Sequence, residues 1–297
     1  MRVRVGCEFV HGLDIPAHAV LQVEPRLDGE FRIVDERWTA EPDLPATRYV
    51  DSYGNLCRRL TLPPGVSTLR YDCLAETPDE PDPSDPGAGE VPAAALPDEV
   101  LLYTLPSRFC PSDELSDLAW KLFGGTEPGW SRAQAVCDWV HDEITFGYGT
   151  SSPVTTAADV VESRRGVCRD FAHLAVTLCR GLGIPARYTF GYLPDIDVEP
   201  VGHPMDFCAW TEVFLGGRWW TFDPRNNQRR KGRVLIGRGR DALDVAMVTS
   251  FGAADLRSMV VWADRVEDGP GDGPGVGDRV DGDVARQEGI VQTESAS

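Results

Sequence analysis

The first 75 residues alternate between apolar and polar positions, which is the period of a β-strand with one buried face. Val3, Val5, Cys7 and Phe9 would lie on one face of the first strand. Similar short patterns recur at residues 20–23, 31–34, 48–50 and 69–71, with turn sequences such as Asp28-Gly29 and Pro63-Pro64-Gly65 between them. The pattern predicts a small all-β domain over residues 1–75, built as a β-sandwich.

Two other regions lack a hydrophobic period. Residues 76–97 are rich in proline and acidic residues, which is typical of an extended linker. Residues 266–297 are mostly glycine, aspartate and other polar residues, so we expect a disordered tail there. The remaining segment, residues 98–265, would then be the main domain.

Helical patterns come first in this segment and strand patterns follow. Helices are predicted from Ser112 toward Phe123, after a capping box of Ser131 and Gln134, after Thr156 with Asp159, and over residues 168–182. Strands are predicted over residues 186–192, 207–215 and 218–223. Helices followed by an antiparallel sheet make the fold class α+β.

Composition and charge narrow the kind of protein. The chain has 297 residues, 42% hydrophobic and 26% charged, as in a globular protein, and its net charge of −18 argues against nucleic acid as a partner. No apolar run is long enough to span a membrane, and the N-terminus lacks the apolar stretch of a signal peptide. The eight cysteines have no disulfide or zinc spacing, so we expect a protein of the reducing cytoplasm with no membrane partner.

Cys168 is the strongest candidate for chemistry. It lies in the first turn of a predicted helix, where free backbone N–H groups and nearby Arg164, Arg165 and Arg169 would lower the pKa of its thiol. The alternative is a small buried cysteine that only fills space. His173 is five residues further, roughly 140° around the helix from Cys168, so a structural role is predicted for it.

The predicted hairpin brings two more residues together. Gly216-Gly217 favours a tight turn that pairs Leu215 with Arg218, which places Trp210 opposite Asp223. Cys208 and Asp223 would then be diagonal neighbours on one face, about 7–8 Å apart. A base and the carboxylate that orients it need this relation, although Asp223 could also only begin the turn at Pro224.

These segments together resemble the transglutaminase-like superfamily of cysteine acyl-transfer enzymes. The resemblance covers about residues 100–260 and is carried by Gly166 to Tyr192 and by Phe207 to Asn227. It implies a papain-like core preceded by an N-terminal β domain, and attack of a thiol on a peptide or carboxamide carbonyl through an acyl-enzyme. It implies no metal and no organic cofactor. Cys168 corresponds to the nucleophile and Asp223 to the orienting carboxylate, but the position of the family's base histidine holds Cys208.

The exchange at position 208 leaves several outcomes open. Loss of a general base typically costs a factor of roughly 10²–10⁴ in rate. His203 could supply the base, Cys168 could be thiolate without one, or Cys208 could itself be the reactive thiol. Two thiols facing one pocket also allow a zinc site, with Asp223 and His203, or a Cys168–Cys208 redox pair. The rival function is an inactive module that binds peptides or a protein partner, and the substrate and oligomeric state stay open.

Overall fold

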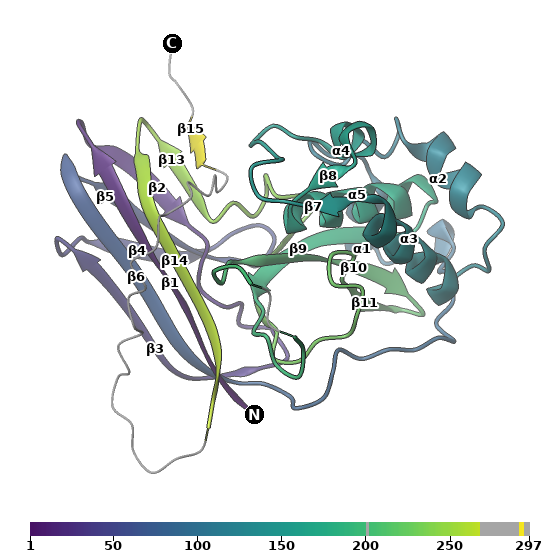
Figure 1. Ribbon diagram of the computed structural model, residues 1–297, viewed down its shortest axis with the longest axis horizontal. Coiled ribbons are helices and arrows are strands. Elements are labelled where there is room, and N and C mark those ends of the chain that lie inside the picture. Colours follow the sequence, from purple (N-terminus) through teal and green to yellow (C-terminus); the bar gives the residue numbers. More distant parts are fainter. Residues whose placement is uncertain (200–201, 268–290, 294–297) are drawn as a thin grey trace.

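The computed structural model describes residues 1–199, 202–267 and 291–293 of the chain, and its two halves lie side by side (Figure 1). The N-terminal half is built from two sheets whose strand orders are β14-β1-β6-β3 and β15-β13-β2-β5-β4. The strands are β1 (Arg2–Leu13), β2 (Ala17–Leu21), β3 (Arg32–Glu41), β4 (Ala46–Val50), β5 (Leu56–Leu62), β6 (Gly65–Glu76), β13 (Val248–Phe251), β14 (Asp255–Val266) and β15 (Val291–Thr293). The predicted strand-rich N-terminal region is therefore confirmed.

The inner face of β1 explains this packing. Val3, Val5, Cys7 and Phe9 are all at most 1% exposed, and they join buried residues of both sheets in one core cluster. Their spacing of two residues is the alternation seen in the sequence.

Strands from opposite ends of the chain pair in this half. β14 lies antiparallel beside β1, with Val5 opposite Ala263, and β13 pairs with β2. Both late strands, except for Val266 at the end of β14, fall inside the range 98–265 that we assign to the main domain, so the sheets do not follow that boundary. The division into domains stays a prediction.

The second half carries helices on a four-stranded antiparallel sheet of order β11-β10-β9-β12 (Figure 1). Its strands are β9 (Ala186–Tyr192), β10 (Cys208–Leu215), β11 (Arg218–Phe222) and β12 (Val234–Gly239), and a small pair is formed by β7 (Thr145–Phe146) and β8 (Arg165–Gly166). The helices are α1 (Asp98–Leu101), α2 (Ser116–Phe123), α3 (Trp130–Glu143), α4 (Ala157–Ser163) and α5 (Cys168–Gly181), with short 3₁₀ turns at Ala93–Ala95 and Leu102–Thr104. This arrangement confirms the α+β fold class.

Two of the predicted helix starts are wrong. α3 begins at Trp130, because Gly129 has φ of 101° and the Trp130 N–H donates to Ala88, so Ser131 lies inside the helix and caps nothing. α2 begins at Ser116 and has no side-chain cap, so Ser112 lies outside it. The capping box of Thr156 with Asp159 at the start of α4 is confirmed.

The predicted hairpin register is confirmed. Leu215 pairs with Arg218, and the pairing continues to Thr211 opposite Phe222. Gly216 and Gly217 have φ of 59° and 86°, the left-handed values that a two-residue hairpin turn requires.

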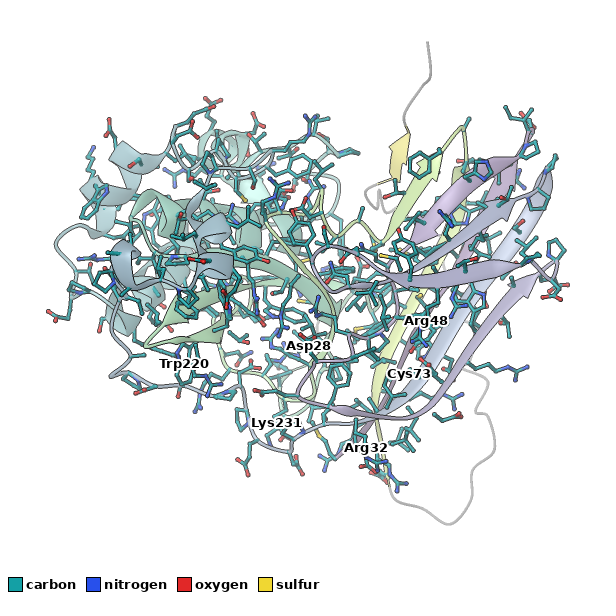
Figure 2. All side chains as sticks on the ribbon, turned by 180° about the vertical axis from the view of Figure 1, so that it is seen from behind. Asp28, Arg32, Arg48, Cys73, Trp220 and Lys231 are labelled. Atoms are coloured by element: carbon teal, nitrogen blue, oxygen red, sulfur yellow. The ribbon has the colours of Figure 1, made fainter. Side chains whose placement is uncertain are left out.

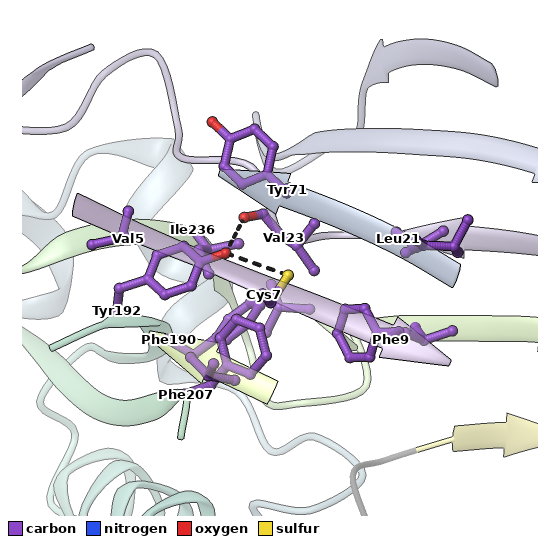
Figure 3. Packing of buried hydrophobic residues seen from close by; sticks show 14 of the residues in the cluster. Val5, Cys7, Phe9, Leu21, Val23, Tyr71, Phe190, Tyr192, Phe207 and Ile236 are labelled. Atoms are coloured by element: carbon purple, nitrogen blue, oxygen red, sulfur yellow. Dashed lines mark hydrogen bonds between the residues drawn. The ribbon is translucent and has the colours of Figure 1, made fainter. Parts of the chain in front are cut away.

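The halves are joined by contacts both in the interior and at the surface. The hydroxyl of Tyr192 in β9 donates to the Val23 carbonyl at 2.9 Å and lies 3.7 Å from Cys7 Sγ in β1 (Figure 3). Asp28, labelled between the halves in Figure 2, accepts a hydrogen bond from Arg238 of β12 at 3.1 Å. One core therefore extends from the N-terminal sheets into the sheet that carries the candidate site.

The structure describes the whole connection between the two halves but only part of the C-terminal tail. Residues 77–92 form no helix or strand, yet they contact the second half at several points. Most of the predicted disordered tail lies outside the described residues. Within its range, Val266 ends β14 and β15 pairs in parallel with β13.

Candidate active site

Cys168 is the first residue of α5, and two contacts fix this end of the helix. The carboxylate of Asp170 accepts the Val167 N–H at 2.8 Å and thereby caps the first turn. Further along, the hydroxyl of Thr211 in β10 donates to the Ala172 carbonyl at 3.3 Å, which holds the helix against the sheet. The start of α5 is therefore held at the beginning of β10.

The sulfur of Cys168 lies against the backbone of this strand. Its Sγ is 3.7 Å from the carbonyl oxygen of Phe207 and accepts a hydrogen bond from the Ala209 N–H. Pairing with β11 begins only at Thr211, so the preceding residues of β10 have that edge free. Cys168 takes the place that a neighbouring strand would otherwise occupy.

Cys208 lies beside Cys168, as the sequence predicts for the residue at the histidine position. The two cysteines pack in one apolar cluster, and their thiols form a side-chain hydrogen bond. This bond lowers the pKa of Cys168 against the effect of burial, and the positive charge of Arg225 lowers it further. The same bond, with burial and the negative charge of Asp223, raises the pKa of Cys208 well above its ordinary value.

All eight cysteines lie among the described residues, so the pKa of Cys168 can be compared with the pKa of every other thiol. Burial raises the thiol pKa in the six cysteines outside the site, Cys7, Cys57, Cys73, Cys110, Cys137 and Cys179. Cys168 alone has a lowered pKa, and it alone is not fully buried. The lowered pKa and the partial exposure therefore coincide in one cysteine.

The cation whose charge acts on the thiols is Arg225, not Arg164 or Arg169 near the start of α5. Arg225 lies over the ring of Phe146 at 4.3 Å. In contrast, Arg169 pairs with Asp170 at 3.0 Å and Arg164 pairs with Glu143 at 3.0 Å. The charge that favours the Cys168 thiolate thus comes from the residues after the hairpin.

Asp223 lies just past the end of β11 and is already occupied by other partners. Its Oδ2 accepts from Arg233 at 2.7 Å and from the Asn226 side chain at 2.9 Å, while Oδ1 accepts the Asn226 N–H at 3.0 Å. Burial alone would raise the pKa of Asp223, but Arg233 and Asn226 outweigh it and the pKa is lowered. The carboxylate therefore stays ionised, and it also begins a turn, which was the alternative role predicted for it.

Arg233 connects this carboxylate to the linker. Its Nε lies 3.0 and 2.9 Å from the two carboxylate oxygens of Asp82, and its guanidinium stacks 4.7 Å from the ring of Trp210. Neither Arg233 nor Asp82 was singled out from the sequence. An aspartate in an acidic, proline-rich stretch gives no local signal of such a contact.

Asp206 is another residue that the sequence reasoning missed. It directly precedes Phe207, whose N–H it accepts at 2.7 Å, and its negative charge acts on Cys168. Burial raises the pKa of Asp206 to about 6, partly offset by the Phe207 N–H and by Arg225. The site therefore holds a carboxyl group that changes charge close to neutral pH.

The histidines lie outside the thiol pair. His173 is fully buried, and its Nε2 accepts the Ala242 N–H at 3.0 Å. This hydrogen bond gives the side chain a structural role. His203 is exposed, and its ring lies 5.4 Å from that of Tyr148. Tyr148 in turn is close enough to Cys168 for their charges to interact, which leaves His203 at the margin of the site.

No group of three or more histidine, cysteine or acidic side chains among the described residues is arranged to hold a metal ion. None of the helices formed by these residues has the length and apolar character needed to cross a membrane.

Comparison with known proteins agrees with this geometry. The model of the transglutaminase-like superfamily matches residues 116–224, the range that holds Cys168, Cys208 and Asp223. A candidate cysteine protease from Cytophaga hutchinsonii is 30% identical, with a TM-score of 0.82 over 90% of this chain and 91% of that one. An uncharacterized protein of Mycobacterium leprae is 27% identical over 272 residues, covering 87% of this chain and 97% of its own length. Another, from Mycobacterium tuberculosis, is 29% identical over 243 residues, covering 74% and 77%. The chain belongs to the transglutaminase-like superfamily.

Proposed function

We propose that the protein is a cysteine-dependent enzyme that transfers or hydrolyses acyl groups of peptide or carboxamide substrates through a thioester on Cys168. The observation that carries this proposal is the position of Cys168, half-buried at the start of α5 and against the backbone at the start of β10, where its pKa is lowered. A thiolate at a helix N-terminus is the form in which cysteine attacks a carbonyl carbon.

In this proposal Cys208 is a hydrogen-bond donor and not a base. Its raised pKa keeps it a thiol at neutral pH, so it stabilises the Cys168 thiolate together with the Ala209 N–H. When the Cys168 sulfur attacks the carbonyl carbon, the amine that leaves needs a proton. Asp206, with a pKa of about 6, is the neighbouring acid whose protonation changes in the range where such a transfer works well.

The alternative is an inactive module that binds a peptide or a protein partner. It is favoured by one observation: Asp223 is held by Arg233 and Asn226, so the carboxylate that would orient a base is already paired. For both candidate functions we propose a reducing compartment such as the cytoplasm, because all eight cysteines are free thiols.

The experiment is the pH dependence of Cys168 alkylation by iodoacetamide, read by peptide mass spectrometry. Active chemistry predicts selective labelling of Cys168, with a midpoint well below the free-thiol pKa of about 8.5. The six buried cysteines serve as internal controls, since burial raises their pKa. A normal midpoint, with no preference for Cys168, would rule out the enzyme and favour the binding module. Labelled protein should also lose any activity found on peptide amides.

A further inference from the structure

The pair of thiols at the start of β10 has a chemistry that acyl transfer does not use. Cys168 and Cys208 are in contact within one apolar cluster. The Cys168 sulfur lies 3.7 Å from the Phe207 carbonyl oxygen and the Cys208 sulfur 3.7 Å from that of Ala209, so both sulfurs lie against the backbone at the start of β10. Neither sulfur forms a disulfide in the structure.

The two sulfurs also differ in the way that sequential oxidation requires. Cys168 is half-buried and has the positive charge of Arg225 nearby, whereas Cys208 is 5% exposed. An accessible, acidified thiol reacts first with an oxidant, and a neighbouring thiol can then resolve the product. The other six cysteines are buried and are absent from this cluster.

We propose that Cys168 and Cys208 form a redox site that reacts with hydroperoxides and closes to a reversible Cys168–Cys208 disulfide. In the first step the Cys168 thiolate attacks one peroxide oxygen. The O–O bond breaks, Cys168 becomes a sulfenic acid, and the alcohol or water leaves after taking up a proton. In the second step the Cys208 sulfur attacks the Cys168 sulfur, and the hydroxyl group leaves as water with the proton of Cys208. The two sulfurs together lose the two electrons that the peroxide gains.

The chain allows an unambiguous test with trypsin. Cleavage after Arg165 and Arg169 gives the peptide 166–169, whose one cysteine is Cys168. Cleavage after Arg187 and Arg218 gives the peptide 188–218, whose one cysteine is Cys208. The reduced, folded full-length protein is treated with hydrogen peroxide, remaining thiols are blocked, and the peptides are separated without reductant.

We expect the two peptides to be recovered as one linked species, lighter by two hydrogens than their sum and separated again by dithiothreitol. Loss of the Cys168 thiol should be roughly ten-fold faster or more than loss of any buried cysteine. Recovery of the two peptides unlinked, after the Cys168 thiol has been consumed, would overturn the proposal. Linkage spread over several cysteines would also overturn it, since that result indicates unfolding.

Two variants separate the roles of the sulfurs. Cys208→Ser keeps a hydroxyl that can donate to Cys168 but removes the resolving sulfur, so Cys168 should stop at sulfenic acid, which dimedone traps. Cys168→Ser should leave Cys208 unoxidised at the same peroxide concentration, because Cys208 is buried and its thiol is not acidified. If Cys208→Ser gives no dimedone adduct while circular dichroism shows a native fold, the first step fails. None of these readouts depends on acyl transfer, so the redox site and the proposed enzyme can fail separately.

Discussion

Asp82 and Arg233 form a largely buried ion pair that links the connection between the two halves to the candidate site. The Arg233 Nε lies 2.9 and 3.0 Å from the Asp82 oxygens, and the other end of the guanidinium holds Asp223 at 2.7 Å. The side chains of Asp82 and Arg233 are 11% and 8% exposed. The carboxylate that follows β11 is therefore positioned by a residue more than a hundred positions earlier in the chain.

Asp82→Asn should lower the stability of the whole protein. The substitution removes one partner of a buried charge and leaves Arg233 with Asp223 alone, so we expect a loss of about 1–3 kcal/mol in the free energy of unfolding. The measurement is equilibrium unfolding in urea. Asp79→Asn is a matched control in the same segment: Asp79 is 53% exposed, and its ion pairs with Lys231 and Arg265 span 3.7 and 3.9 Å. A change within about 0.5 kcal/mol is expected there, and equal effects of the two variants would contradict the role of the buried pair.

Cys208→His should raise hydrolysis of a peptide amide or glutamine amide. An imidazole at this position would accept the Cys168 proton and become cationic, which a thiol does not do. The gain should approach the general-base factor of roughly 10²–10⁴. Cys208→Gln supplies a polar side chain without a titratable nitrogen and should give no gain. If the histidine variant is folded and no more active than the glutamine variant, the site has lost more than its base.

Asp206→Asn should make Cys168 more reactive at neutral pH. The Asp206 pKa is about 6, so above that pH its negative charge raises the pKa of Cys168. Asparagine removes this charge, and alkylation at pH 7 should become roughly two- to five-fold faster. Asp264→Asn is the control, because burial also raises the pKa of Asp264 but it lies on β14, in the other half. An unchanged alkylation rate in Asp206→Asn would show that the carboxylate does not act on the thiol.

The same carboxyl group predicts how stability depends on pH. The pKa of Asp206 is raised in the folded protein, to about 6 from 3.8, so the folded state binds the proton more tightly than the unfolded chain. The contribution of Asp206 to the free energy of unfolding is therefore most favourable below pH 4 and is lost as the pH rises through about 6. Its full size is on the order of 3 kcal/mol. Asp206→Asn should remove this part of the pH dependence, giving a flatter profile between pH 4 and 7 than the native protein. Parallel profiles for the two proteins would exclude Asp206 as the group responsible.

Gly191→Ala should disrupt the sheet beneath the site. A Cβ at Gly191 would lie 2.3 Å from the Val234 carbonyl oxygen, a backbone atom that cannot turn away. β12 would have to shift, and Arg233 with it, so we expect a loss of about 1–3 kcal/mol in unfolding free energy. Gly125→Ala is the control, since nothing lies within 4 Å of its added Cβ. A neutral Gly191→Ala variant would mean that β9 and β12 are free to separate.

The sequence predicts the parts of this protein that depend on local chemistry. The Gly216-Gly217 turn determines the register of the hairpin, in which Leu215 pairs with Arg218 and Thr211 with Phe222. The start of α5 at Cys168 follows from its apolar period and from the turn before it. These features need only neighbouring residues.

The parts that could not be predicted depend on contacts between distant segments. Ser131 has the sequence of a helix cap, but the approach of Ala88 to Gly129 moves the helix start to Trp130. Asp82 has no motif around it, and its function becomes visible only when Arg233 is beside it. Arg225 follows the hairpin and belongs to no motif, and its effect on the thiols depends on how the folded chain brings them together.

The pairing of β1 with β14 has a consequence for how the chain is made. Val5 meets Ala263 across this ladder, and β2 likewise meets β13. On a ribosome, the first strands emerge long before their partners and must wait while about 250 residues are added, at roughly 5–20 residues per second. The helices and hairpin around Cys168 have closer partners and can form during this interval. The N-terminal sheets are therefore first in the chain but among the last parts to be completed, and β1 keeps an open edge until synthesis reaches β14.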